Sequence, residues 1–172
     1  LYFQGINTNI VAPIGFNNNI IKSSLIRDLT SKGRIEEVNR LIYRPYRLSG
    51  NIIKGMGIGR TLGFPTANIE VSQSKLLPGD GIYAVKRLPY KNSNVQIQNL
   101  WGLLYIGNRP TFDGRTKSTE INFLEYPDSD QKDRLTIEII KKIRDEKKFN
   151  DKSELKNQMF LDKKELFSLI LR

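Results

Sequence analysis

The segment Gly55-Met-Gly-Ile-Gly-Arg-Thr-Leu-Gly-Phe-Pro-Thr-Ala-Asn-Ile-Glu-Val71 shows the pattern that decides the fold. A run of turn-forming residues leads directly into a short strand. From Tyr46 to about Ile143 the same alternation recurs, and no helix is expected inside this region. The predicted strands are Tyr46–Ile53, Ala67–Val71, Gly81–Leu88, Leu100–Ile106, Thr119–Glu125 and Leu135–Ile143. Six short strands without helices between them predict a mainly β protein, a six-stranded antiparallel, Greek-key-like barrel.

A helix is expected before the barrel region. Ser23 or Ser24 is suited to cap it, and an approximate apolar stripe runs from about Leu25 to Leu41, with an interruption near Gly33. Pro45 cannot continue a helix and therefore marks its end. The sequence thus predicts a short N-terminal helical stub.

A second helix is expected at the C-terminus. Ser153 is its predicted cap, and Glu154 lies in its first turn. Apolar residues recur at helical spacing at Leu155, Met159, Leu166 and Ile170. We expect this helix, including Asp162, to pack against the barrel.

The composition restricts the possible chemistry. The 172 residues contain no cysteine and no histidine, which excludes disulfides, thiolate catalysis and Cys/His metal sites. A general base must be a carboxylate, a lysine or a tyrosine, and a bound metal would be a hard cation that prefers oxygen. No apolar run approaches the ~20 residues needed to cross a bilayer, so no membrane span is expected.

The chain divides into three parts. Leu1–Gly5 resembles the remnant of a cleavable tag and is excluded from fold reasoning. Residues 6–44 are predicted to form a lead-in with the helical stub, and residues 45–172 the main domain. The net charge is +10, and residues 6–65 carry nine Lys/Arg against three Asp/Glu. This excess is consistent with a solvated surface, with attraction of phosphate groups, or with nucleic-acid binding.

The glycine-rich segment is a candidate phosphate-binding loop. Glycines at 55, 57, 59 and 63 allow the backbone to approach a ligand closely and to direct N–H groups at an anion. Arg60 adds a planar cation suited to phosphate. The segment is not a P-loop, because no Gly-Lys-Ser/Thr follows. A flexible hairpin connection is the simpler alternative.

Thr66 and Asn68 are candidate metal ligands. In a strand they lie two residues apart and point to the same face. Hydroxyl and amide oxygens suit Mg²⁺ whose charge is mostly balanced by nucleotide phosphates. Thr and Asn also commonly stabilise turns, so this alternative stays open at this point.

Five ordered motifs resemble those of one family. Gly59–Asn68, read as Gly-Arg-Thr-Leu-Gly-Phe-Pro-Thr-Ala-Asn, resembles the signature of riboflavin kinases. Four further segments follow the family in order: Leu77–Val85, Ile106–Phe112, Ser118–Ile121 and Ile143–Phe149. The resemblance covers about residues 46–165. Within it, Arg109–Thr111 is expected to be a rigid turn that shapes the site.

The resemblance implies an enzyme that phosphorylates the ribityl hydroxyl of riboflavin with Mg-ATP in a direct in-line transfer, giving FMN and ADP. It implies that Thr66 and Asn68 hold Mg²⁺ and the phosphates, and that Glu120 is the general base. The ATP phosphates would be covered by Gly55, Gly57, Gly59, Arg60, Gly63 and Pro65, with Thr66. The flavin would contact Arg144, Lys147 and Phe149. From position alone, the simpler interpretation is that Glu120 is an exposed strand residue and that Arg144 and Lys147 are solvated; the family resemblance favours the functional roles.

The upstream part resembles a domain junction. Ile21–Arg27, Gly33 and Tyr43–Tyr46 are similar to the region where the adenylyltransferase domain of bifunctional bacterial FAD synthetases meets the kinase. The resemblance therefore implies an upstream adenylyltransferase domain as partner in the full-length protein, and a cytoplasmic location. Because the adenylyltransferase nucleotide motif contains histidine and this chain has none, we expect no FAD synthesis by this chain alone.

Two other functions are compatible with parts of the sequence. A basic barrel could bind single-stranded nucleic acid, but its aromatic residues do not alternate regularly with Lys/Arg. A relative that binds flavin without turnover is the other alternative. The sequence departs from the family pattern at Lys22, Tyr105, Asn122 and Asp128–Asp133. These departures bear on nucleotide affinity and activity, and they leave Thr66, Asn68 and Glu120 in place.

Overall fold

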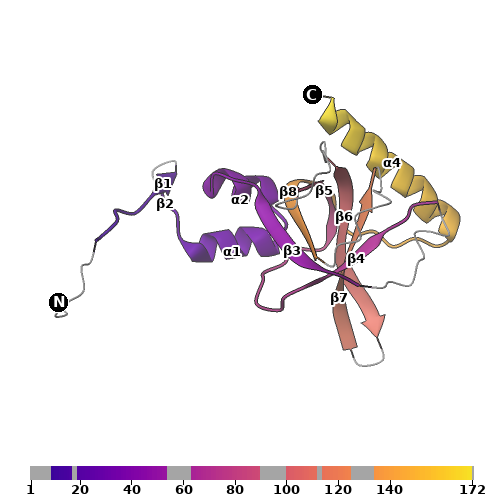
Figure 1. Cartoon of the computed structure of the whole chain (residues 1–172), viewed down its shortest axis with the longest axis horizontal. Helices are drawn as coiled ribbons and strands as arrows, with labels where there is room; N and C mark the ends of the chain where they lie inside the picture. The colour runs from indigo at the N-terminus through magenta and orange to yellow at the C-terminus, as the bar shows by residue number, and fades with distance from the viewer. Residues whose placement is uncertain are drawn as a thin grey trace.

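The centre of the protein is a closed barrel of antiparallel strands in the order β3-β4-β7-β6-β5-β8 (Figure 1). The structure is a computed structural model that describes residues 9–16, 19–53, 63–89, 100–111, 114–124 and 134–171. The barrel strands are β3 Tyr46–Ile53, β4 Ala67–Val71, β5 Gly81–Arg87, β6 Trp101–Thr111, β7 Gly114–Phe123 and β8 Arg134–Arg144. The predicted six-stranded antiparallel barrel is confirmed.

Strands β6 and β7 are longer than predicted and continue as a ribbon beyond the other strands (Figure 1). The prediction that Arg109–Thr111 forms a turn is wrong, because its backbone pairs in register with β7 through Pro110↔Arg115 and Thr111↔Gly114. Proline lacks an N–H group, and it is tolerated where a strand has one free edge. At this end of the ribbon, β7 is the one described strand that pairs with β6.

Alternation along the strands separates an inner and an outer face of the barrel. The inner side chains form one buried cluster: Leu48, Ile69, Tyr83, Val85, Leu104, Ile106, Ile121, Phe123, Leu135, Ile137 and Ile139. Because successive strand residues point to opposite faces, Asn68 and Glu120, next to Ile69 and Ile121, belong to the outer face. The candidate site therefore lies outside the barrel.

Two helices stand where one interrupted helix was predicted: α1 Ser23–Ser31 and α2 Ile35–Leu41. Between them Gly33 has φ +72°, and a Cβ added there would lie 2.5 Å from the Tyr83 hydroxyl oxygen. Only glycine satisfies both conditions. The predicted serine cap is wrong: Lys22 is the N-cap residue, and it makes no side-chain capping bond.

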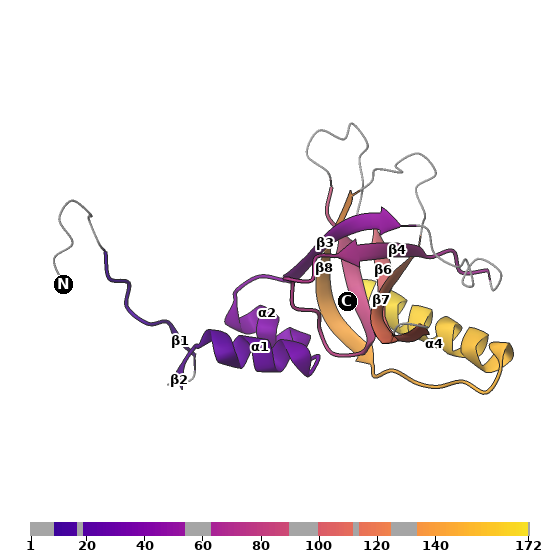
Figure 2. The ribbon, with the colours of Figure 1, turned by 90° about the horizontal axis from the view of Figure 1, so that it is seen from below.

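The N-terminal helices pack onto the barrel core (Figure 2). Leu29, Ile35 and Val38 belong to the same buried cluster as the inner barrel residues. The Asn39 side chain donates to the Ile139 carbonyl at 2.9 Å and accepts from the Tyr46 N–H at 2.7 Å. A two-stranded hairpin, β1 Gly15–Phe16 with β2 Asn19–Ile20, precedes them. The division of the chain at residue 45 stays a prediction.

The C-terminal helix α4, Lys152–Ile170, lies on a different side of the barrel from α1 and α2 (Figure 2). Leu166 packs on Ala84 and Leu103 of the outer sheet face. The predicted cap at Ser153 is wrong, because Asp151 is the N-cap and its carboxylate accepts from the Glu154 N–H at 2.8 Å. A carboxylate at the N-terminus of a helix is also stabilised by the positive end of the helix dipole.

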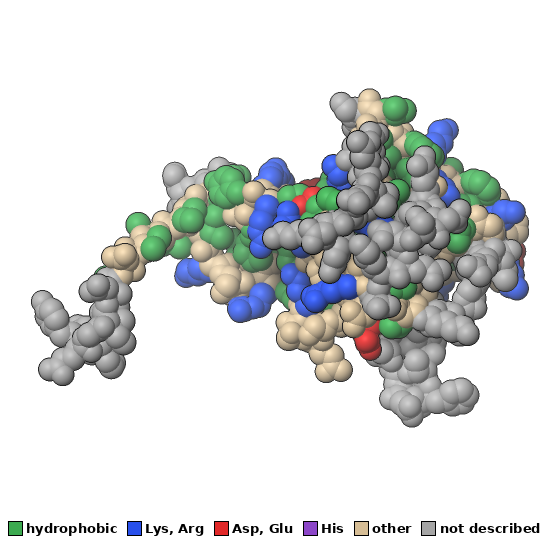
Figure 3. Space-filling model, viewed as in Figure 1, with side chains coloured by type: hydrophobic (Ala, Val, Ile, Leu, Met, Phe, Trp, Pro, Cys, Tyr) green, Lys and Arg blue, Asp and Glu red, His purple; other side chains and the backbone are tan. Residues whose placement is uncertain are grey.

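The surface carries basic side chains over the N-terminal helices, the barrel and α4 (Figure 3). Exposed hydrophobic residues occur at both ends of the described chain: Ile10, Val11, Ile14 and Phe16, and Phe160, Leu161, Phe167 and Leu171. Among the described residues, no helix combines the length and apolar character that crossing a membrane requires.

Candidate active site

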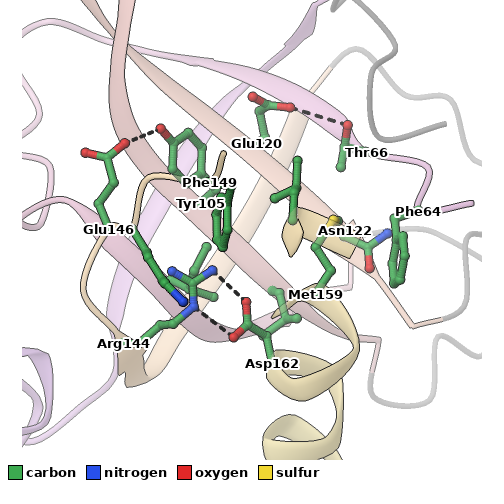
Figure 4. A pocket seen from close by; sticks show the side chains of 14 residues that line it. Phe64, Thr66, Tyr105, Glu120, Asn122, Arg144, Glu146, Phe149, Met159 and Asp162 are labelled. Atoms are coloured by element: carbon green, nitrogen blue, oxygen red, sulfur yellow. Dashed lines mark hydrogen bonds and ion pairs between the residues drawn. The ribbon is translucent and has the colours of Figure 1, made fainter. Parts of the chain in front are cut away.

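A pocket of about 320 Å³ lies on the outer face of the barrel (Figure 4). Its walls come from the outer faces of β5, β6 and β7, the segment before β4, the segment after β8, and α4. The lining residues are Phe64, Thr66, Ile82, Leu103, Tyr105, Glu120, Asn122, Arg144, Glu146, Lys147, Phe149, Leu155, Met159 and Asp162. A mostly apolar cavity of this size with a few polar groups is typical of a small-molecule site.

Thr66 and Glu120 meet at one end of this pocket (Figure 4). The Thr66 hydroxyl donates to Glu120 Oε2 at 3.4 Å, and the Ser118 hydroxyl donates to Glu120 Oε1 at 3.3 Å. Asn68 is the register partner of Glu120 across β4 and β7. Asn68 is 8% exposed and is not among the lining residues. The barrel thus brings three predicted site residues together, with two of them in the pocket wall.

The residues predicted to contact flavin line the other wall. The Arg144 guanidinium lies 5.8 Å and the Lys147 ammonium 5.6 Å from the Phe149 ring centroid. Arg144 also forms a bidentate ion pair with Asp162 of α4, with both N···O distances at 2.8 Å. Lys147 pairs with Glu154 at 3.5 Å. This wall is therefore cross-linked to α4 by two ion pairs.

Charge also anchors the segment that follows β8. The hydrogen bond from Lys142, 2.5 Å long, lowers the pKa of the Asp145 carboxyl from its ordinary value. The Tyr105 hydroxyl donates to Glu146 Oε1 at 2.6 Å. At the Phe64 end, burial lowers the pKa of Lys163, whose ammonium lies 4.8 Å from the Phe64 ring centroid. The contacts of Asp145 and Glu146 hold the segment after β8, which lines the pocket.

A family model described as Flavokinase, riboflavin kinase, matches residues 42–170. The chain belongs to the riboflavin kinase family. This confirms the resemblance drawn from the five motifs.

Relatives of this riboflavin kinase family member are bifunctional. A protein named bifunctional riboflavin kinase/FMN adenylyltransferase from Bacillus subtilis (strain 168) is 38% identical over 148 residues, which cover 84% of this chain and 45% of the relative. The protein of the same name from Haemophilus influenzae is 33% identical over 142 residues, covering 83% and 44%. The chain therefore spans about half the length of these curated relatives.

The fold of the riboflavin kinase family member is also found in a solved structure. The crystal structure of a macrolide-efflux protein from Streptococcus pneumoniae superposes with a TM-score of 0.77 at 27% sequence identity. The match covers 90% of this chain and 49% of that one. This likeness shows that the barrel and its flanking helices also occur together in another protein.

The donor set of the site fits a magnesium ion. Thr66 and Asn68 offer neutral oxygens beside the single carboxylate of Glu120. Mg²⁺ is usually bound by one or two protein groups together with substrate phosphates and water. Among the described residues, no group of three or more acidic, histidine or cysteine side chains could hold a metal ion. The residues therefore suit a cation that arrives with a nucleotide.

Part of the predicted nucleotide site lies outside the described residues. Gly55, Gly57, Gly59 and Arg60 belong to this part, as does the departure at Asp128–Asp133. Gly63 and Pro65 are described. Gly63 has φ +84°, in the left-handed region that favours glycine, and the Pro65 carbonyl accepts from the Asn122 side chain at 2.7 Å.

Sequence reasoning missed several lining residues of the pocket. Asp162 was expected only to pack against the barrel, but it lines the pocket and pairs with Arg144. For Tyr105 and Asn122 the sequence indicates only departures from the family pattern. Strand alternation is the signal that could have found them. Tyr105 lies two residues after Leu103, and Asn122 lies two residues after Glu120, so each shares the outer face with that neighbour.

Proposed function

We propose that this protein transfers the γ-phosphoryl group of ATP to the terminal ribityl hydroxyl of riboflavin, forming FMN and ADP. The observation that carries the proposal is the Thr66–Glu120 pair in the wall of a mainly apolar pocket, in a chain of the riboflavin kinase family. Apolar walls suit an isoalloxazine ring, and the polar end suits a hydroxyl that must be oriented.

Glu120 is proposed as the general base. Phosphoryl transfer requires an oriented nucleophile in line with the phosphorus and little covalent chemistry from the protein. The Glu120 carboxylate accepts hydrogen bonds from Thr66 and Ser118, which hold it in place at the pocket wall. From there it can accept a hydrogen bond from the ribityl hydroxyl and take its proton as the new P–O bond forms.

Thr66 and Asn68 are proposed to hold Mg²⁺ and the ATP phosphates. When bound, Mg²⁺ would neutralise part of the negative charge of the phosphates. The loop residues Gly55, Gly57, Gly59, Arg60, Gly63 and Pro65 are proposed to cover those phosphates through N–H groups and the Arg60 guanidinium. Pro65 and Gly63 immediately precede Thr66, so ATP would approach the site from the side of this loop.

The flavin ring is proposed to lie against Phe149, with Arg144 and Lys147 near its polar edge. Phe149 supplies a planar apolar surface for the ring. Arg144 is already bidentate with Asp162, so its contribution is a fixed positive charge and a rigid wall. Lys147 is half exposed and its ammonium is freer to turn toward a bound anion.

The relationship to the second activity of the relatives is also a proposal. They are named as kinase and adenylyltransferase together, and this chain matches about half of their length. We expect residues 45–172 to carry the kinase and residues 6–44 to join it to an adenylyltransferase domain. Because the chain has no histidine, we expect it not to make FAD by itself. A cytoplasmic location remains a prediction from the resemblance.

The direct test is chromatographic detection of FMN formed from riboflavin and Mg-ATP, with a control lacking divalent metal. Metal-dependent FMN supports the proposal. Riboflavin binding by the folded protein without any FMN would favour a relative that binds flavin without turnover.

A further inference from the structure

Asn122 is a buried polar side chain in the wall of the pocket (Figure 4). It lies on β7 two residues after Glu120, and therefore on the same outer face of the barrel. Its side chain is buried, with the residue 4% exposed. Polar groups this deeply buried normally have all their hydrogen-bonding atoms satisfied.

One half of the Asn122 amide is satisfied by the protein. Its Nδ2 donates to the Pro65 carbonyl at 2.7 Å. A carbonyl oxygen can only accept a hydrogen bond, so this contact requires the amide nitrogen to face Pro65. The orientation of the other half follows: Oδ1 points away from Pro65, and it has no hydrogen-bond partner within the part of the chain that the structure describes.

The free oxygen needs a donor, which restricts what can bind there. ATP phosphates at neutral pH are acceptors and cannot supply one. The isoalloxazine ring has a single N–H donor at the end farthest from the ribityl chain. The ribityl chain carries several hydroxyls, and its terminal one faces Glu120 in the proposed function. Strand residues two apart are separated by about 6.6–6.8 Å, so with the terminal hydroxyl at Glu120, Asn122 is within reach of a hydroxyl closer to the ring.

We propose that Asn122 is a specificity-determining residue whose Oδ1 accepts a hydrogen bond from a ribityl hydroxyl, an inference that rests on the proposed function. The same side chain positions Thr66, because its Nδ2 holds the neighbouring Pro65 carbonyl. Asn122 therefore distinguishes flavins that carry a polyol chain from flavins that carry an alkyl group at the same ring nitrogen.

The test compares riboflavin with lumiflavin, which has the same ring and a methyl group in place of the ribityl chain. Dissociation constants are measured by flavin fluorescence without nucleotide. For Asn122→Ala, riboflavin binding is expected to weaken about tenfold, the effect of losing one hydrogen bond, with lumiflavin binding unchanged. Asn108→Ala is the matched control, because Asn108 is exposed, lies outside the pocket and bonds to Asp80.

An equal loss for both flavins, or no loss for either, overturns the inference and leaves Asn122 a structural residue. If Asn122→Ala does not fold, the unaltered protein is measured with flavins that lack one ribityl hydroxyl each. A loss of about tenfold on removal of one hydroxyl other than the terminal one supports the inference, because the terminal hydroxyl is assigned to Glu120. Equal binding of all analogues, or a loss confined to the terminal position, overturns it. This test measures binding and no turnover. Its outcome can therefore be told apart from a failure to make FMN in the kinase assay, which would contradict the proposed function.

Discussion

Arg144 at the end of β8 and Asp162 in the middle of α4 form two parallel hydrogen bonds, both 2.8 Å long. Asp162 is 4% exposed and also accepts from Gln158 at 2.9 Å. The pair fixes α4 against the barrel at the pocket, and it explains why a helix expected only to pack supplies part of the site. Planar two-point contacts of this kind give geometric precision as well as energy.

Asp162→Ala is expected to lower the free energy of unfolding by about 3 kcal/mol, because it leaves the Arg144 guanidinium partly buried without its partner. Urea denaturation of the purified variant measures this loss. The control on the same helix is Glu165→Ala, since Glu165 forms an exposed 3.6 Å pair with Lys141 worth at most about 0.5 kcal/mol. Equal effects of the two substitutions would show that the Arg144–Asp162 pair contributes little.

Glu120→Gln is expected to lower kcat for FMN formation by about 100-fold or more, since an amide cannot accept the proton of the substrate hydroxyl. Riboflavin binding should change little because the size of the side chain is kept. The control is Glu70→Gln, an exposed carboxylate on the neighbouring strand β4. Turnover that survives in Glu120→Gln contradicts the general-base assignment.

Thr66→Ala is expected to raise the KM for Mg-ATP by about tenfold while leaving riboflavin binding nearly unchanged, because a ligand oxygen is removed on the nucleotide side. Thr66→Ser keeps the hydroxyl and should restore most of the affinity. Steady-state kinetics at varied Mg-ATP measure both variants.

Asn68→Ala tests the second proposed ligand in the same assay, and it is expected to raise the KM for Mg-ATP in the same direction. Its thermal stability must be checked first, since Asn68 is buried between β3 and β7. Normal nucleotide kinetics in a folded Asn68→Ala protein would remove it from the site.

Tyr83 predicts a dependence of stability on alkaline pH. Burial, followed by the charges of Asp145 and Asp80, raises the pKa of the Tyr83 phenol well above its ordinary value of 10.0. The folded state therefore keeps this proton while the unfolded state releases it, so the free energy of unfolding falls as the pH rises above about 10. Urea denaturation at several pH values between 8 and 11 measures the slope.

Tyr83→Phe removes this titration and should show a shallower fall over the same pH range. At neutral pH the variant is expected to be less stable by about 1 kcal/mol, because the hydrogen bond to the Gly79 carbonyl is lost. Identical slopes for the two proteins would mean that Tyr83 does not contribute to the alkaline transition.

Much of the barrel could be predicted from local patterns. Strands β3 and β4 have the predicted bounds, because turn residues frame each run and apolar residues recur with period two. The prediction of element boundaries was weaker where the same residue types occur in more than one kind of local structure. Arg, Pro and Thr at 109–111 are predicted to form a turn, but pairing with β7 makes them part of a strand. Likewise, Asp151 and Ser153 are both good helix caps, and only Asp151 bonds to a free N–H.

The sequence by itself determined the barrel, the family and the candidate residues Thr66, Asn68 and Glu120, since these depend on short-range periodicity and ordered motifs. Only the tertiary structure decided which of them touch. Thr66 and Glu120 are 54 residues apart and meet because β4 pairs with β7 in one register. Arg144 meets Asp162, and Asn122 meets Pro65, for the same reason: such contacts depend on how strands align and where a helix packs, which no local pattern contains.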